Sequence, residues 1–511
     1  MKYGKYVLFL SRKYKTVSYI QKLFTSLKIT GTTLYGQNIK PGDLFIALSG
    51  KFMHGINYIS YIKNLSKCIV LTDNAGIEKF NEILMPILVH KDPRLIISQI
   101  AADIYSKPSE SLIVIGITGT SGKTTTVYLI EAGLRSVGRI TGLIGTTEIK
   151  IGRRNLTSHL TTPEAPDLQY LLAVMIANGV DTVVMEVSSH ALELNRVNNV
   201  KFALVGFTNL SYDHLDFHLT MDKYFKTKAR LFKSISVNCA NIKVVCVDDK
   251  AGALIAILAE KTVTISANNR IADWQINKVF PARSRSQKFS IINSSGFCYE
   301  FIVEIPGYIS TINKMLAFTI LGCIGLIPEE SSLSLHNLKV SGRLQSIKYE
   351  QSFLVIVDYA HKPSALQAIL KTLTVYKNSY SLKFSRILIV IGSGGNRYAN
   401  KRISMGKIAV SMADLIIITD DNPRNEDPET VRSELILGTA TALHTKTRVI
   451  EIANRYNAIN EVISYAFPED IILIAGKGHE DNQIIFRQNR YFNDQYELEV
   501  ALNEQKLKHL I

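Results

Sequence analysis

Cysteine is scarce in this sequence, which has only five in 511 residues: Cys68, Cys239, Cys246, Cys298 and Cys323. No two of them form a C-x-x-C pair, and their number is odd. This pattern favours reduced thiols in a cytoplasmic protein over a disulfide-bonded secreted one.

Long hydrophobic runs are also lacking. The amino terminus, MKYGKYVLFLSRKYK, has five consecutive apolar residues and no small-residue cleavage site, which makes it a poor signal peptide. The longest apolar stretch, 315–328, is too short to span a bilayer and contains glycine and proline. We therefore expect no membrane association.

Clustered positive charge is absent as well, although the net charge is +15 and the pI is near 9.3. The lysines are scattered and no five-residue cationic block occurs. This favours a solvated basic surface, or anionic substrates, over a nucleic-acid partner.

The length and the hydrophobic content of 46% indicate a globular chain of about three domains. We place their limits at 1–107, 108–341 and 342–511. Residues 44–48 resemble a strand in the first domain, and the segment after Trp274, up to residue 305, alternates like antiparallel β structure.

The segment 111–126, SLIVIGITGTSGKTTT, organises the middle domain. Residues 112–117 read as a buried strand, and from Val127 the apolar spacing is helical, so a glycine-rich turn joins a strand to a helix. The spacing is a shortened variant of the Walker pattern, since Ile117 stands where that pattern has glycine.

Such a loop is suited to a polyphosphate. Gly119 and Gly122 let backbone N–H groups approach the phosphates, Lys123 reaches the terminal ones, and the Thr124 hydroxyl can bind Mg²⁺. Further strands are predicted at 182–187, 203–208 and 243–247, each before a polar turn.

Two of these turns supply further candidate ligands. Glu186 ends one predicted strand and His214 follows another; with Thr124 they could coordinate Mg²⁺ between the substrate and ATP phosphates.

The last domain repeats this pattern of a strand followed by a polar cluster. The predicted strands 353–358, 386–392, 414–419 and 471–476 precede YAH, SGGNR, DDNPR and KGHE. Ligands of open α/β sheets bind at the carboxyl ends of the strands, so these clusters should converge on one crevice.

Several motifs together resemble those of the Mur ligases of peptidoglycan synthesis, in family order from Pro41 to Asp494. They are GITGTSGKTTT, TTP at 161–163, EVSSH at 186–190, DHLDFH at 213–218, YFKTK at 224–228, GR at 342–343, DYAH at 358–361 and GKGHE at 476–480.

The resemblance implies an α/β fold of three domains: an amino-terminal α/β UDP-binding domain, a central P-loop parallel-sheet ATPase domain and a carboxyl-terminal Rossmann-like domain that binds the amino acid. The family members most resembled add the third residue of the stem peptide. The implied substrates are ATP, UDP-N-acetylmuramoyl-L-alanyl-D-glutamate and meso-2,6-diaminopimelate, with Mg²⁺ as cofactor and a monomeric, cytoplasmic enzyme.

The resemblance also assigns residues. Lys228 matches a lysine that is carbamylated in the family and joins Thr124, Glu186 and His214 at the metal; without the resemblance it would read as a surface lysine of an amphipathic helix. The implied nucleotide-binding residues are Gly119, Thr120, Ser121, Gly122, Lys123, Thr124, Thr125, Asn313, Arg343 and Asp358. The role of His361 stays open.

The implied substrate-binding residues are Thr161, Thr162, Ser188, Arg196, Arg397, Asp421, Asn422, Pro423, Arg424, Gly476 and Glu480. In Asp421–Asn422–Pro423–Arg424 the arginine can pair with the far carboxylate of diaminopimelate, and Glu480 with its ammonium; lysine lacks that carboxylate. One departure from the family is Tyr35–Gly36–Gln37, which replaces an Asp-Ser-Arg expected near the uridine diphosphate.

We predict an ATP-dependent carbon–nitrogen ligase that acts through an acyl phosphate. The alternatives are the same reaction with L-lysine, a ligase like folylpolyglutamate synthase, and a non-catalytic, ATP-switched binding protein that uses its basic surface on a polyanion.

Overall fold

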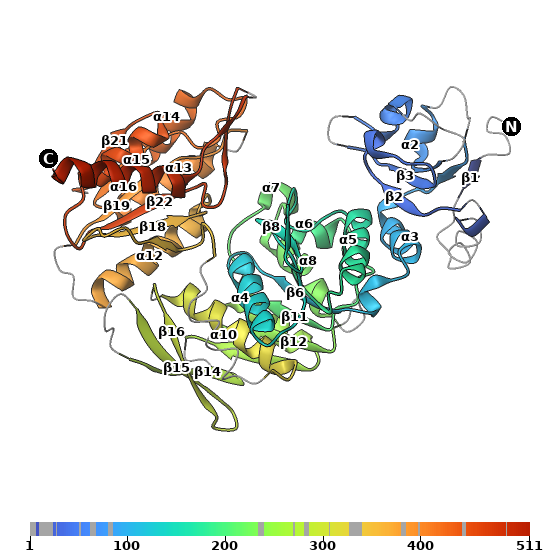
Figure 1. The fold of residues 1–511 in the computed structure, drawn as a ribbon, viewed down its shortest axis with the longest axis horizontal. Helices are drawn as coiled ribbons and strands as arrows, with labels where there is room; N and C mark the ends of the chain where they lie inside the picture. Colours follow the sequence, from blue (N-terminus) through green and yellow to red (C-terminus); the bar gives the residue numbers. More distant parts are fainter. Residues whose placement is uncertain are drawn as a thin grey trace.

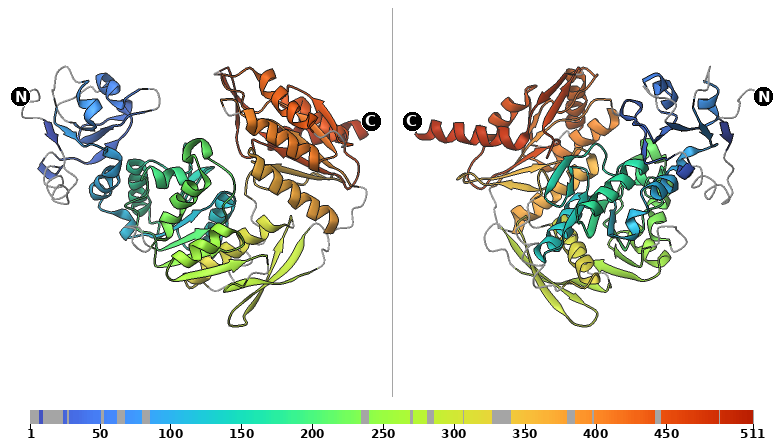
Figure 2. Two further views of the ribbon diagram at one scale, coloured as in Figure 1. Left: turned by 180° about the vertical axis from the view of Figure 1, so that it is seen from behind. Right: turned by 45° about the vertical axis from the view of Figure 1, so that its right-hand side comes forward.

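A computed structural model of the chain describes residues 7–9, 24–26, 28–50, 53–61, 68–79, 85–233, 240–268, 271–280, 286–305, 307–326, 340–379, 385–396, 399–441, 446–486 and 488–510. Three α/β units follow one another along the chain, each around its own sheet (Figure 1). The first and third units stand at the two ends of the central one, so that the molecule is a crescent (Figure 2). The predicted three-domain α/β fold is confirmed.

The first unit is a parallel sheet whose apolar strands are covered by short helices. Its helices include α2 (Asn74–Ile77) and α3 (Ile97–Ile104). The strands, from edge to edge, are β1 (Val7–Phe9), β5 (Ile87–Val89), β4 (Ile69–Thr72), β3 (Asp43–Ala47) and β2 (Gly31–Thr33).

The central unit has an 11-stranded sheet that is parallel in its middle and antiparallel at both edges. The strands, in order, are β16 (Cys298–Val303), β15 (Gln287–Asn293), β14 (Trp274–Val279), β13 (Thr262–Ser266), β12 (Ile242–Cys246), β11 (Leu204–Phe207), β6 (Ile113–Thr118), β10 (Thr182–Glu186), β7 (Thr141–Ile144), β8 (Glu148–Ile151) and β9 (Arg154–Thr157). The predicted antiparallel segment is β14 to β16, which extends one edge of the sheet.

Helices cover both faces of this sheet, as a parallel sheet requires. They are α4 (Lys123–Ser136), α5 (Ala165–Ala177), α6 (Ser189–Glu193), α7 (Leu215–His218), α8 (Met221–Ala229), α9 (Lys250–Leu258) and α10 (Tyr308–Cys323). Because β6 lies between β11 and β10, the segments that follow these three strands meet at one edge of the sheet.

The third unit has a six-stranded sheet, parallel except for its first strand. The strands are β17 (Gln345–Ile347), β18 (Leu354–Asp358), β22 (Ile471–Ala475), β19 (Ile387–Ile391), β20 (Leu415–Ile418) and β21 (Arg448–Glu451), with a hairpin of β23 (Asn482–Ile485) and β24 (Gln488–Tyr491). The surrounding helices are α12 (Pro363–Ser379), α13 (Ala399–Met412), α14 (Pro428–Ala440), α15 (Arg455–Ser464) and α16 (Asp494–Leu510).

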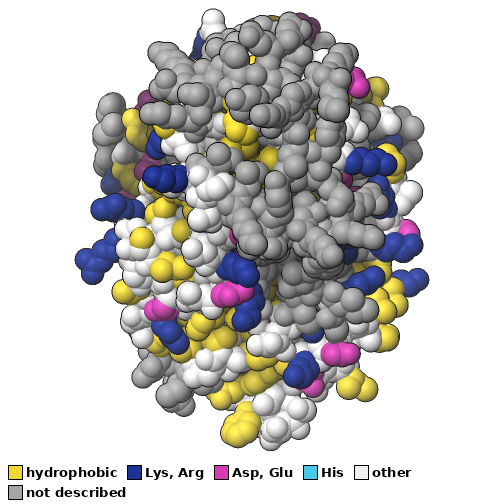
Figure 3. Space-filling model, turned by 90° about the vertical axis from the view of Figure 1, so that its right-hand side faces the viewer, with side chains coloured by type: hydrophobic (Ala, Val, Ile, Leu, Met, Phe, Trp, Pro, Cys, Tyr) yellow, Lys and Arg dark blue, Asp and Glu magenta, His cyan; other side chains and the backbone are white. Residues whose placement is uncertain are grey.

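Two surface observations bear on the sequence predictions. Among the described residues, no helix combines the length and the apolar composition that crossing a bilayer would need. On the face shown in Figure 3, the described Lys and Arg side chains are scattered among other side-chain types rather than gathered in one patch.

Candidate active site

The phosphate loop lies between the end of β6 and the start of α4, as predicted. Gly122 has a φ of 86°, and a Cβ there would lie 2.3 Å from Oδ1 of Asn313, so only glycine fits. The helix begins at Lys123, four residues before the predicted Val127, because its first turn is polar and carries no apolar periodicity.

Lys123 is held by its own loop. Its Nζ donates to the backbone carbonyls of Gly119 (2.9 Å) and Thr120 (3.0 Å). Burial lowers the pKa of Lys123 to about 8, partly offset by Glu186. A bound phosphate would favour the charged ammonium and give it an anionic acceptor.

Thr124 and Glu186 meet across neighbouring elements. The Thr124 hydroxyl donates to Oε1 of Glu186 at 2.9 Å, and the backbone N–H of Thr146 donates to the same oxygen at 2.8 Å. Among the described residues no group of three or more His, Cys, Asp and Glu side chains could hold a metal ion. An ion here would therefore need phosphate oxygens as well, which suits Mg²⁺.

His214 lies in the segment after β11 with a φ of 52°, an uncommon backbone conformation for this residue type. Its Nε2 lies 3.2 Å from Oδ2 of Asp213 and 3.4 Å from Nζ of Lys362. Burial, followed by the Lys362 ammonium, holds the pKa of His214 well below its usual value. A neutral imidazole is the form that can bind a metal.

Lys228 lies on α8. The helical pattern alone would place it on the surface, but the residue is buried and only 1% exposed. Its Nζ donates to the carbonyl of Gly119 at 2.8 Å and lies 4.8 Å from the centre of the Tyr224 ring. Burial, and then the Lys123 ammonium, lower the pKa of Lys228 well below its usual value. The helix thus delivers this lysine to the phosphate loop.

The third unit contributes Arg343 and Asp358 from the domain boundary. Nη2 of Arg343 lies 3.4 Å from the Thr124 hydroxyl, and its guanidinium lies 4.5 Å over the Tyr359 ring. Its buried Nε has no hydrogen-bond partner among the described residues. Asp358 accepts the backbone N–H of Leu344 at 2.7 Å. The unused donor of Arg343 fits an anionic ligand such as a phosphate.

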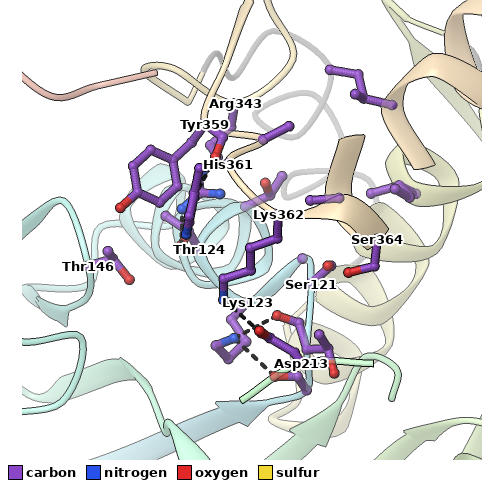
Figure 4. A pocket seen from close by; sticks show the side chains of 18 of the residues that line it. Ser121, Lys123, Thr124, Thr146, Asp213, Arg343, Tyr359, His361, Lys362 and Ser364 are labelled. Carbon is purple, nitrogen blue, oxygen red and sulfur yellow. Dashed lines mark hydrogen bonds and ion pairs between the residues drawn. The ribbon is translucent and has the colours of Figure 1, made fainter. Parts of the chain in front are cut away.

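These residues line one cavity of about 1170 Å³ between the central and third units (Figure 4). Of the predicted site residues, its walls include 119–125, Thr161, Glu186, Ser188, Arg196, His214, Lys228, Asn313, Arg343 and Asp358. The structure therefore brings together the whole predicted nucleotide and metal set.

The predicted peptide-binding residues form a network beside Glu186. The Thr162 hydroxyl donates to the carbonyl of Glu186 at 2.8 Å and accepts the N–H of Ser188 at 3.0 Å. Arg196 donates to the carbonyl of Thr162 at 3.0 Å and pairs with Glu164 at 2.9 Å. Thr162 itself is fully buried, so it supports this wall without lining the cavity.

The first unit reaches this network through Tyr35 and Arg94. Tyr35 is 46% exposed, and its partial burial, followed by the charges of Asp167 and Glu164, raises its pKa. Arg94 pairs with Glu164 at 3.2 Å. The segment Tyr35–Gly36–Gln37 itself contains no guanidinium.

The predicted amino-acid residues that the structure describes form a group in the third unit, and none of these lines the cavity described above. Asn422 donates to Oε2 of Glu480 at 2.8 Å, and burial raises the pKa of Glu480. Arg424 has a φ of 58° and donates to the carbonyl of Gly395 at 2.7 Å. Pro423 precedes it, Gly476 lies near Asp421, and Arg397 lies outside the described residues.

Two lysines that the sequence did not single out belong to these sites. Nζ of Lys477 is buried and lies 3.3 Å from Oδ1 of Asp421 and 3.2 Å from Oδ1 of Asn422. Lys362 pairs with Asp213 at 2.7 Å across the domain boundary. The only sequence signals for these two lysines were the position of Lys477 within GKGHE and that of Lys362 directly after DYAH.

A phosphate loop that faces a second α/β unit across a cavity, with carboxylate and hydroxyl groups for a cation, defines a nucleotide-dependent enzyme whose parts come from two domains.

The chain belongs to the Mur ligase family and is an ATP-dependent peptide ligase. Residues 117–321 match the Mur ligase middle domain, and residues 342–478 match the Mur ligase, glutamate ligase domain.

Relatives of similar length share this assignment. The chain is 41% identical over 466 residues to UDP-N-acetylmuramoyl-L-alanyl-D-glutamate–2,6-diaminopimelate ligase of Corynebacterium glutamicum, covering 90% of this chain and 89% of the relative. It is 39% identical to the enzyme of that name from Streptomyces avermitilis, with 93% of each chain covered. A solved structure of a ligase with that name superposes with a TM-score of 0.63 at 29% identity, covering 94% of this chain and 95% of the other.

Proposed function

We propose that this enzyme joins meso-2,6-diaminopimelate to UDP-N-acetylmuramoyl-L-alanyl-D-glutamate at the expense of ATP. The names of the relatives support both substrates. The observation that carries the proposal is the presence of two sites. One is the cationic cavity around the phosphate loop, and the other is a polar group in the third unit that contains both Arg424 and Glu480.

The first step activates a carboxylate. An oxygen of the D-glutamyl carboxylate attacks the γ-phosphorus of ATP, ADP leaves, and an acyl phosphate forms. Lys123 and Arg343 offset the charge that spreads over the transferred phosphoryl group, since both line the cavity and Arg343 has an unused donor. Mg²⁺, held by Thr124, Glu186 and His214 together with phosphate oxygens, would supply further charge neutralisation.

The second step forms the amide. The neutral amine nitrogen of diaminopimelate attacks the acyl carbon, the tetrahedral intermediate loses the amine proton to water, and inorganic phosphate leaves with the electrons of the acyl C–O bond. Phosphorylation is needed because oxide would be the leaving group of a free carboxylate. The cationic side chains around the phosphate loop stabilise the departing phosphate.

Lys228 is the proposed carbamylated residue. Carbamylation requires a neutral amine to attack CO₂, and burial, followed by the Lys123 ammonium, lowers the pKa of Lys228 and so favours that form. A carbamate would add an anionic oxygen next to Mg²⁺ and remove an ammonium that repels the ion.

Selection of diaminopimelate is assigned to the group around Asn422. The Arg424 guanidinium can pair with the distal carboxylate, and Glu480 with the distal ammonium. The Lys477 ammonium donates to the side-chain oxygen of Asn422. The amide nitrogen of Asn422 therefore points to Glu480, donates to its carboxylate and holds it in place. L-Lysine would leave Arg424 without its partner.

The test is phosphate release from ATP with UDP-N-acetylmuramoyl dipeptide and, in parallel, diaminopimelate, L-lysine, no amino acid, or nucleic acid alone. Release that requires the dipeptide and diaminopimelate supports the proposal. A preference for L-lysine selects the alternative substrate, and release with nucleic acid alone would contradict the ligase assignment.

We also propose that the domains span 1–107, 108–341 and 342–511. The enzyme would be monomeric and cytoplasmic, with no nucleic-acid or membrane partner. A role in cell-wall synthesis, and hence in cell shape and division, follows from the proposed substrates.

A further inference from the structure

Two loops from different domains touch inside the active-site cavity. One follows β11 in the central unit and carries Asp213 and His214; the other follows β18 in the third unit and carries Lys362, directly before the first turn of α12, which holds Ser364. Lys362 pairs with Asp213 at 2.7 Å, and the Ser364 hydroxyl lies 3.4 Å from the carbonyl of Tyr212. Figure 4 shows Lys362 extending into the cavity toward Asp213.

The Lys362 ammonium lies at the phosphate end of the cavity. Its Nζ is 3.4 Å from Nε2 of His214, a proposed metal ligand, and its charge also acts on Lys123 and Lys228. Lys362 therefore shares the terminal-phosphate end with Lys123.

The ion pair between Lys362 and Asp213 must change when ATP and Mg²⁺ bind. A divalent ion on His214 would repel an ammonium at this distance. Lys123, Arg196 and Arg343 also line the cavity, so a further ammonium there is stabilised most by a multiply charged anion. A triphosphate is such an anion.

We propose that Lys362 binds the γ-phosphate of ATP from the third unit and so makes that unit sense whether the nucleotide carries a third phosphate. The inference rests on the proposed function. In the nucleotide-free protein Asp213 holds the ammonium in the cavity. With ATP bound the ammonium transfers to the γ-phosphate, which ties the amino-acid domain to the activated substrate.

The alternative is that Lys362 only connects the two domains through its ion pair. Loss of such a connection would change the affinities for ATP and ADP equally, or change neither, whereas loss of a γ-phosphate ligand would weaken only the binding of ATP. The informative variant is Lys362→Met, which keeps the unbranched chain as far as Cε and removes the ammonium. The matched control is Lys371→Met, an exposed lysine on α12 of the same unit.

The measurement is the dissociation constant of a non-hydrolysable ATP analogue and of ADP, each with Mg²⁺, by titration calorimetry. Lys362→Met should weaken the analogue about tenfold, as expected for the loss of a charge-assisted hydrogen bond, and leave ADP within about twofold. Lys371→Met should change neither constant. The unchanged affinity for ADP also shows that the variant is folded.

Equal weakening of both nucleotides, or of neither, would overturn the role of Lys362. The proposed function is tested separately, by the wild-type protein. If the wild type forms no UDP-tripeptide from its substrates, the proposed function fails; if it does and Lys362→Met binds the analogue normally, only the present inference fails.

Discussion

Buried lysines give the cavity its chemical character. Lys123 and Lys228 are held near the carbonyl of Gly119, and burial lowers the pKa of both. Cationic side chains outnumber carboxylates among the residues that line the cavity. Without a ligand this arrangement is unfavourable, and a polyphosphate relieves it, so the site is prepared for an anion before one arrives.

Lys228→Ala should lower ligation at least about 1,000-fold, because it removes the proposed carbamate and with it a metal ligand. The control is Lys226→Ala on the same helix, since the Lys226 side chain is 70% exposed and forms a surface ion pair with Asp222. Product formation is followed by chromatography of the UDP-linked species. Equal activity of the two variants would refute the role of Lys228.

Arg424→Ala should raise KM for diaminopimelate about 10- to 100-fold, because a carboxylate loses a charge-assisted partner. KM for ATP should stay within about twofold, since Arg424 does not line the nucleotide cavity. Initial rates at varied concentrations of each substrate measure both constants. A variant that still prefers diaminopimelate over L-lysine to the wild-type degree would contradict the assignment.

At the scale of the element, helix α8 shows how local sequence positions a functional residue. Thr220 caps its first turn by accepting the N–H of Lys223 at 3.2 Å, and Lys228 lies in its last turn. Thr220→Ala should lower the free energy of unfolding by about 1 kcal/mol. Thr220→Ser keeps the hydroxyl and should behave as wild type in urea titrations; an equal loss in both variants would exclude capping as the cause.

Helix α5 carries a carboxyl group that should make stability depend on pH. Burial, and then the charge of Glu164, raise the pKa of Asp167 from 3.8 to about 6. Between these values the folded state binds a proton that the unfolded state has lost, so the stabilisation present below pH 4 disappears as the pH rises through 6.

Asp167→Asn should remove this dependence. From pH 4 to pH 7 the wild type should lose about 2 kcal/mol of unfolding free energy relative to the variant. Urea titrations of both proteins at the two pH values measure the difference, and parallel pH profiles would contradict the shifted pKa.

The sequence predicted elements well where they are buried on both faces. β6, β10 and β22 are apolar runs that end in polar turns, and they lie within one residue of the predicted bounds. The start of α4 was missed because KTTT has no apolar period. The pairing of Lys362 with Asp213 and that of Lys477 with Asp421 were not predictable, because these partners lie 149 and 56 residues away in sequence.

At the scale of the whole molecule, the proposed amino-acid residues belong to a different unit from the phosphate loop. None of the described ones lines the cavity that holds the loop, although Tyr359, which lines it, interacts with Glu480, so the account expects the third unit to close over the central one when the amine meets the acyl phosphate. Adding a non-hydrolysable ATP analogue, the UDP-dipeptide and diaminopimelate should reduce the radius of gyration in small-angle X-ray scattering. An unchanged radius with all three bound would contradict this closure.

The central claim is that a triphosphate held by the middle unit activates an acid for an amine delivered by the last unit. The most direct test is mass spectrometry of the UDP-linked species after incubation of the wild type with ATP, Mg²⁺, UDP-N-acetylmuramoyl-L-alanyl-D-glutamate and diaminopimelate. The account predicts one new species, heavier by one diaminopimelate residue, formed in step with ADP. Consumption of ATP with no heavier UDP-linked species would contradict it.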